Sequence, residues 1–151
     1  MTVGVAVIVA SGLVALAIGG WRAYADGRFR GTHPVRGAGD DPAGPADREP
    51  QEARLVPADE LGERVTLLQF SSAFCAPCRA ARRVLADVAD TVPGVAHVEI
   101  DAEHHLDLVR RVGVLRTPTT LVLDARGVEV ARAAGAPRRE QVLAAVARAL
   151  G

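Results

Sequence analysis

The feature that most constrains this chain is its one pair of cysteines, which lie in the segment Cys75-Ala76-Pro77-Cys78. A disulfide within this segment would close a loop of only four residues, and so short a loop removes little entropy from the unfolded chain. The pair is therefore better explained by chemistry than by stability. C-x-x-C at a junction between a strand and a helix predicts a dithiol/disulfide redox site.

The residues around the pair predict that junction. The apolar run Val65–Phe70 predicts a buried strand, and Arg79–Asp90 carries apolar residues at helical spacing. Cys75 would then lie at a helix N-terminus, where free N–H groups and the helix dipole favour a thiolate. Pro77 suits the first helical turn. We expect Cys75 to be the exposed nucleophile and Cys78, one turn further in, to be the sheltered resolving thiol.

An uncharged apolar run occupies residues 2–21. About 20 apolar residues span a bilayer as a helix, and Trp21 and Arg22 suit the interface and the headgroups. A cleaved signal peptide is the alternative, since Ala23-Tyr24-Ala25 resembles an A-x-A cleavage site. No Lys or Arg precedes the run, and the run is longer than a usual signal core, so the sequence favours an uncleaved membrane anchor.

Arginines follow this run, and the positive-inside rule therefore places the rest of the chain in the cytoplasm. An extracytoplasmic domain, or one exported after cleavage, is the alternative. Residues 22–52 are rich in Pro and Gly and poor in large apolar residues, which predicts a flexible linker that lets the domain reach partners near the membrane. Residues 53–151 are expected to form the folded domain.

The sequence pattern of residues 53–151 predicts a short first strand at Leu55–Val56, followed by strands and helices in the order βαβα and then ββα. A parallel unit joined to an antiparallel hairpin gives a mixed central sheet flanked by helices, which is an α/β fold. The further segments that carry this prediction are a strand at Val95–Ile100, a helix at Asp101–Arg111, strands at Thr119–Leu123 and Val128–Ala133, and a last helix opened by Pro137 and Arg138.

Composition argues against a nucleic-acid partner. The chain has 18 basic and 18 acidic residues, and every basic residue is Arg, so no basic excess exists to meet phosphates. Aromatic residues make up only 3%, too few for a platform on which bases stack.

Four features of the chain occur in register: Phe70–Arg79 with the C-x-x-C, Val98–Asp101 as a third strand, Val112–Thr119 with Thr117-Pro118, and Gly135 after the last strand. Through these features the chain resembles the thioredoxin family from Leu55 to Leu150. The resemblance implies a thioredoxin-like fold in which Pro118 is cis and faces Cys75, and in which the loop at Thr117 and Pro118 binds an extended substrate chain. Without the resemblance, Pro118 could be only a turn residue.

The chain departs from the family pattern at several positions. Phe74 replaces the usual Trp and Ala76 the usual Gly, and both changes keep an apolar contact surface. Gln69 stands where the family usually has a buried Asp, and His97 where it usually has Lys. Our hypothesis is that Gln69 and His97 form a neutral, hydrogen-bonded pair with His97 as proton carrier. A half-buried strand histidine with no role is the alternative.

The resemblance implies a thiol–disulfide oxidoreductase of the protein-disulfide reductase type, with no cofactor beyond the Cys75–Cys78 disulfide. Its partners would be disulfide-containing proteins and an electron donor, which in the cytoplasm would be a thioredoxin-reductase-type flavoprotein. A copper or zinc chaperone that uses the same cysteines with His104 and His105 is the alternative, although no zinc-finger spacing is present. A binding module with an incidental disulfide is a third interpretation.

Overall fold

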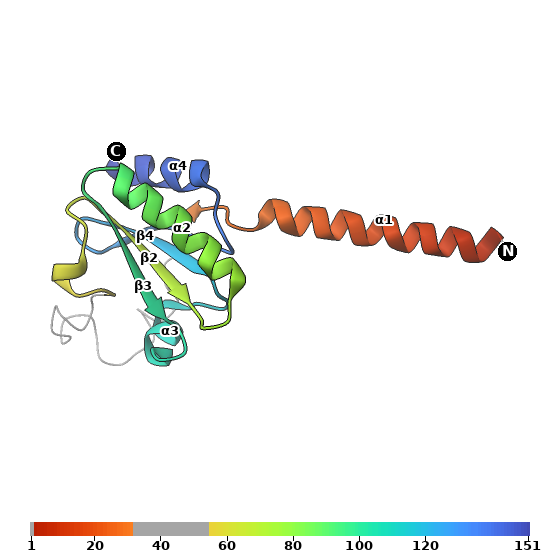
Figure 1. Ribbon diagram of the computed structural model, residues 1–151, viewed down its shortest axis with the longest axis horizontal. Helices are drawn as coiled ribbons and strands as arrows, with labels where there is room; N and C mark the ends of the chain where they lie inside the picture. The colour runs from red at the N-terminus through yellow and green to blue at the C-terminus, as the bar shows by residue number, and fades with distance from the viewer. Residues whose placement is uncertain (1, 32–54) are drawn as a thin grey trace.

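Figure 1 shows the computed structural model, in which a long N-terminal helix precedes a layered domain. It describes residues 2–31 and 55–151. Most of the expected linker, and the expected domain start at residue 53, lie outside these ranges. The helix α1 (Thr2–Ala25) contains the stretch Gly4–Arg22, which is long and apolar enough to cross a membrane, a property that a signal sequence shares.

Within the described residues the domain is built on a five-stranded sheet in the order β1-β5-β4-β2-β3. β2 pairs in parallel with β3 and antiparallel with β4, so a parallel unit adjoins an antiparallel hairpin, as the order of elements predicts. All seven residues of β2 are buried, because β2 lies inside the sheet. The strands are β1 (Arg30–Gly31), β2 (Val65–Ser71), β3 (Val95–Asp101), β4 (Thr119–Asp124) and β5 (Glu129–Ala134).

Helices cover both faces of the sheet, with α2 (Ala76–Thr91) and α4 (Arg139–Leu150) on one face and α3 (Leu106–Val112) toward the other (Figure 1). Successive residues of β2 point to opposite faces. Leu67 joins the apolar cluster beneath α2 and α4, and Leu68 joins the cluster on the side of α3. This is the mixed sheet flanked by helices that the sequence predicts.

The expectation about the first strand is wrong. Leu55–Val56 forms a bend followed by a short 3-10 turn, Ala58–Glu60, although Val56 is still buried in the core. The first strand is instead β1, which pairs antiparallel with β5 from within the segment that composition assigns to the linker. Two residues carry no hydrophobic period, so nothing in the local sequence marks them as a strand.

The third helix begins later than expected. The sequence predicts Asp101–Arg111, whereas β3 runs through Asp101 and α3 begins at Leu106. The Asp101 carboxylate accepts the backbone N–H of Glu103, and its carbonyl accepts Nδ1–H of His105 at 3.0 Å. Asp101 therefore stabilises a turn between β3 and α3 rather than the start of the helix.

Candidate active site

The two cysteines lie where β2 turns into α2, and a disulfide joins them. Cys75 is the N-cap of α2, and its Sγ accepts the backbone N–H of Cys78 at 3.1 Å. Pro77 lies in the first turn, as expected. Because Sγ of Cys75 already accepts an N–H at the positive end of the helix, the same geometry favours a thiolate on Cys75 after reduction.

The two sulfur-bearing residues differ in exposure. Cys78 is 2% exposed and belongs to the core, whereas Cys75 is only partly buried. A substrate disulfide therefore reaches Cys75 first. This asymmetry matches the division into an attacking and a resolving thiol that the sequence predicts.

The loop before β4 is tied to the cysteine turn. Its Thr117–Pro118 peptide bond is cis, as the resemblance implies. The hydroxyl groups of Ser72 and Thr117 are hydrogen-bonded at 3.0 Å, and the Pro118 carbonyl accepts the backbone N–H of Gly135 at 2.7 Å. The C-x-x-C turn, the Thr-Pro loop and the glycine after β5 thus come together, although they lie far apart in the sequence.

Two large apolar side chains are almost completely exposed in these loops. Phe74 is 98% exposed immediately before Cys75, and Leu115 is 96% exposed in the loop that leads to Pro118. Exposed apolar groups beside a reactive sulfur fit an apolar contact surface. Sequence reasoning singled out Phe74 and missed Leu115. A large apolar residue three positions before Pro118, outside any periodic segment, was the available signal.

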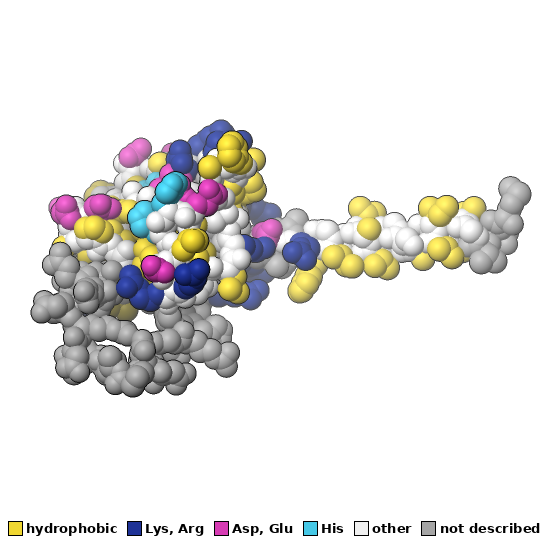
Figure 2. All heavy atoms as spheres, turned by 90° about the horizontal axis from the view of Figure 1, so that it is seen from below, with side chains coloured by type: hydrophobic (Ala, Val, Ile, Leu, Met, Phe, Trp, Pro, Cys, Tyr) yellow, Lys and Arg dark blue, Asp and Glu magenta, His cyan; other side chains and the backbone are white. Residues whose placement is uncertain are grey.

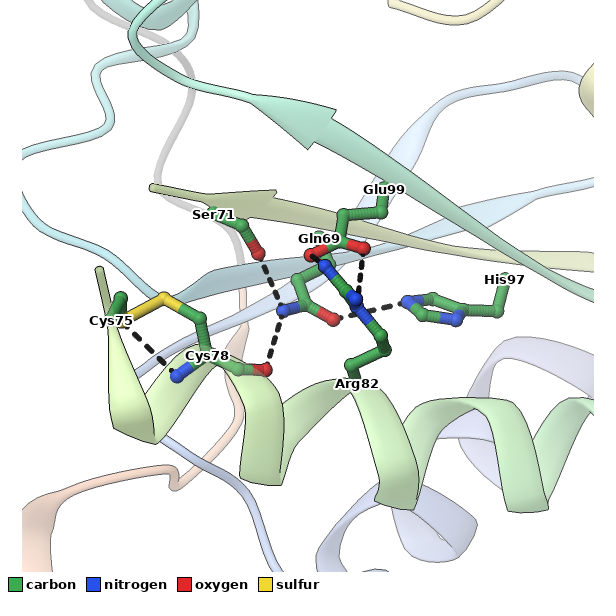
Figure 3. A network of polar contacts seen from close by, with 7 residues as sticks. All are labelled: Gln69, Ser71, Cys75, Cys78, Arg82, His97 and Glu99. Carbon is green, nitrogen blue, oxygen red and sulfur yellow. Dashed lines mark hydrogen bonds and ion pairs between the residues drawn. A yellow bond between two sulfur atoms is a disulfide. The ribbon is translucent and has the colours of Figure 1, made fainter. Parts of the chain in front are cut away.

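Gln69 makes three hydrogen bonds, two of which connect α2 to β3 (Figure 3). Its amide group donates to the backbone carbonyl of Cys78 at 3.0 Å and to Oγ of Ser71 at 2.7 Å. Its amide oxygen accepts from Nε2 of His97 at 3.1 Å. An amide oxygen only accepts, so His97 carries a proton on Nε2. The Gln69–His97 contact is thus present, and it leads to the backbone of Cys78 rather than to its sulfur.

Arg82 and Glu99 extend this network (Figure 3). Arg82 donates to the Glu99 carboxylate through Nη2 at 2.7 Å and Nε at 2.6 Å. Burial acts to raise the pKa of Glu99, but hydrogen bonds from Arg82 and Ser71 outweigh it, so the pKa is lowered. Burial also lowers the pKa of His97, more than the charge of Glu99 raises it. The network at neutral pH therefore holds a neutral imidazole beside an ion pair.

Sequence reasoning gave no functional role to Arg82, Ser71 or Glu99. Glu99 lies directly opposite Gln69 in the parallel pair of β2 and β3. Arg82 follows Cys78 by one helical turn, which places both on the same side of α2. The available signal was therefore the register of the parallel pair, which a single sequence does not give.

The two adjacent histidines lie at the end of β3. Nδ1 of His104 is 2.8 Å from Oδ2 of Asp101, and His105 bonds to the Asp101 carbonyl. In residues 2–31 and 55–151, no group of three or more His, Cys, Asp or Glu side chains is arranged to hold a metal ion. Nothing in this part of the chain favours the metal-binding alternative.

Comparison with known proteins gives one consistent family. The thioredoxin family model matches residues 58–148. Thioredoxin H4-1 of Oryza sativa subsp. japonica is 29% identical over 104 residues, which cover 68% of this chain and 78% of that protein. Thioredoxin H2 of Arabidopsis thaliana is 31% identical over 77 residues, which cover 51% of this chain and 57% of that protein.

Solved structures agree on the fold. Thioredoxin NaTrxh from Nicotiana alata superposes with a TM-score of 0.53 at 25% identity, over 59% of this chain and 76% of that one. A mutant thioredoxin from Halobacterium salinarum has a TM-score of 0.55 at 21% identity, over 59% and 77% of the two chains. With a disulfide in C-x-x-C spacing at the start of α2 and a family match over most of the domain, this chain belongs to the thioredoxin family of thiol–disulfide oxidoreductases.

Proposed function

We propose that this chain is a membrane-tethered reductase of protein disulfides. The observation that supports it most directly is the Cys75–Cys78 disulfide, with Sγ of Cys75 at the N-terminus of α2 and Cys78 sheltered behind it. No cofactor is needed beyond this disulfide. An electron donor of the thioredoxin-reductase flavoprotein type would return the pair to the dithiol form.

The reaction takes place in two exchange steps. The Cys75 thiolate attacks one sulfur of the substrate disulfide, a mixed disulfide forms, and the other substrate sulfur leaves as a thiolate. Cys78 then loses its proton and attacks Sγ of Cys75, which forms the Cys75–Cys78 disulfide and releases the second substrate thiolate. Two electrons pass to the substrate, whose thiolates take up protons from water.

The surroundings of Cys75 supply the substrate contacts. Phe74, Ala76 and Leu115 offer exposed apolar surface. The backbone of Thr117 and Pro118 would pair with an extended substrate segment, as an added strand does. Affinity would then come from main-chain hydrogen bonds, which suits a reductase that acts on several proteins.

Reduction potential tests the direction of the reaction. We expect the full chain in detergent, equilibrated with thiol/disulfide buffers, to give a value near that of thioredoxin, about −270 mV, rather than near about −120 mV as in a strong oxidant. Cys75→Ser should abolish reduction of insulin. A value at the oxidising end would contradict the reductase assignment, and unchanged activity of Cys75→Ser would contradict the dithiol mechanism.

His97 is the proposed proton carrier, with Gln69 holding its ring. Thiol exchange measured against pH in the wild type and in His97→Asn tests this role. A carrier predicts that the substitution changes the shape of the pH profile as well as its height. Profiles of the same shape would leave His97 with a positioning role only.

The tether is proposed to be α1, with the domain on the cytoplasmic side. The support is the apolar stretch Gly4–Arg22, which ends in Arg22 and is followed by Arg28 and Arg30. Vesicle flotation of the full chain tests the tether, and protease protection in intact cells tests the side. Release of a shortened soluble protein would instead support a cleaved signal sequence.

A further inference from the structure

The segment that follows α1 is part of the fold rather than a spacer. We call Asp26–Gly31 the strap. The backbone N–H of Gly27 donates to the Ala134 carbonyl at 2.9 Å, and β1 pairs with β5. Phe29 packs against the core cluster beneath α2 and α4. A Cβ on Gly27 would clash with the carbonyl group of Ala136, so the strap lies in direct backbone contact with the domain.

The strap borders the Thr-Pro loop. Arg116, two residues before Pro118, donates through Nη2 to Oδ1 of Asp26 at 2.7 Å and to the Ala134 carbonyl at 3.1 Å. A Cβ on Gly135 would lie 3.2 Å from the Asp26 side chain. The first residue after α1 is therefore bonded to the loop that lies beside the cysteine turn.

The chain between the end of α1 and its first hydrogen bond to the domain is very short. α1 ends at Ala25 and Gly27 is already bonded to the domain, and two residues span at most about 7 Å. Residues 32–54 connect Gly31, which pairs with β5, to Leu55, which packs against the core. Their length therefore does not set the distance between α1 and the domain.

The dithiol end of the domain lies on the side from which α1 leaves. In Figure 1 α1 extends from the same side of the domain as the N-terminal end of α2, which carries the cysteines. Figure 2 shows basic side chains where α1 meets the domain. Basic groups at this position suit the anionic headgroups of a membrane surface, at about 1 kcal/mol each.

We propose that the strap fixes the dithiol at the membrane surface, and that its substrate is a disulfide in the membrane-adjacent segment of a membrane protein. This inference rests on the proposed membrane tether. A disulfide at that distance from the bilayer would meet Cys75, next to the exposed Phe74, without any movement of the domain relative to α1. A disulfide held far from the bilayer lies beyond the reach of a domain with so short a tether.

The test compares two matched substrates in vesicles. The reduced full chain is reconstituted with a single-span peptide whose disulfide-closed loop lies either about 5 or about 30 flexible residues beyond its span. We expect the near disulfide to be reduced at least about tenfold faster, because the effective concentration of the two reacting groups depends on tether length. Equal rates for the two peptides would overturn the proposal.

Two insertions of the same length distinguish the role of the strap from that of residues 32–54. About 20 Gly/Ser residues, which reach roughly 25 Å, are inserted either between Ala25 and Asp26 or between Gly44 and Pro45. The first insertion should bring the two rates within about threefold, and the second should leave the preference unchanged. Loss of the preference with the second insertion would overturn the proposal. A chain that fails to float with vesicles or to reduce insulin would instead overturn the proposed function, and this inference with it.

Discussion

At the scale of single residues, Gln69 places a group that does not titrate behind the dithiol. It is fully buried and satisfies a carbonyl, a hydroxyl and an imidazole at once. The acidic group closest to it in the sheet register, Glu99, is committed to an ion pair with Arg82. Among the residues that the structure describes, the polar contacts of Gln69 therefore involve no unpaired carboxylate.

Replacement of Gln69 by an apolar residue should therefore destabilise the folded domain. Gln69→Leu leaves buried polar partners without a hydrogen bond, and we expect it to lower the free energy of unfolding by about 2–4 kcal/mol. Thr120, which pairs with Gln69 across β2 and β4, is the matched control, since its Oγ1 is buried without a partner among the described residues. Thr120→Val should be neutral or stabilising by up to about 1 kcal/mol. Urea unfolding of a fragment that begins at Asp26 measures both, and equal losses would contradict the argument.

His97 makes stability depend on pH. Burial lowers the pKa of His97 in the folded state, so below the unfolded value of about 6.5 the unfolded chain binds the proton more readily. The contribution of the neutral His97 to the free energy of unfolding is therefore fully present above about pH 6.5, and it is lost as the pH falls toward the pKa of the folded state. Unfolding curves at about pH 7.5 and 5.5 should show this loss in the wild type, and His97→Asn should reduce it. If the wild type and the variant lose the same free energy of unfolding between these two pH values, the pH dependence belongs to groups other than His97.

At the scale of elements, the strap depends on one glycine. Gly27 has φ +73° and no space for a Cβ, so Gly27→Val should detach β1 and lower the free energy of unfolding by about 1–3 kcal/mol. Gly31→Val, in β1 itself, is the control, since nothing lies within 4 Å of a Cβ added to Gly31. Faster hydrogen exchange at the β5 amides in the first variant alone would support the strap. The same exchange rates in both variants would argue against it.

The elements that the sequence predicts well are those with a clear hydrophobic pattern. β2 is a continuous apolar run and α2 has apolar residues at helical spacing, and the position of Cys75 and Cys78 at their junction follows from these patterns. β1 was missed because two residues carry no period and their partner strand lies far along the chain. The ion pair of Arg82 and the exposure of Leu115 were missed because strand register and loop exposure depend on the tertiary fold rather than on local pattern.

At the scale of the whole molecule, the folded unit should begin at Asp26 rather than at residue 53. A fragment over 26–151 keeps β1 and the half-buried Phe29, and we expect it to be more stable than one over 53–151 by about 1–3 kcal/mol. Phe29→Ala in the longer fragment should remove much of the difference. Equal urea midpoints for the two fragments would instead place the domain boundary after the strap.

The pairing of β1 with β5 also has a consequence for the order of events during synthesis. About a hundred residues separate Arg30 from Arg132, and at about 5–20 residues per second they take roughly 5–20 seconds to make. α1 and β1 therefore leave the ribosome long before β5, the strand that pairs with β1, has been made. During that interval α1 is free to enter a bilayer. With α1 as the proposed tether, the redox domain would then fold onto a helix that is already in the membrane, and β5 would complete its pairing with β1 last.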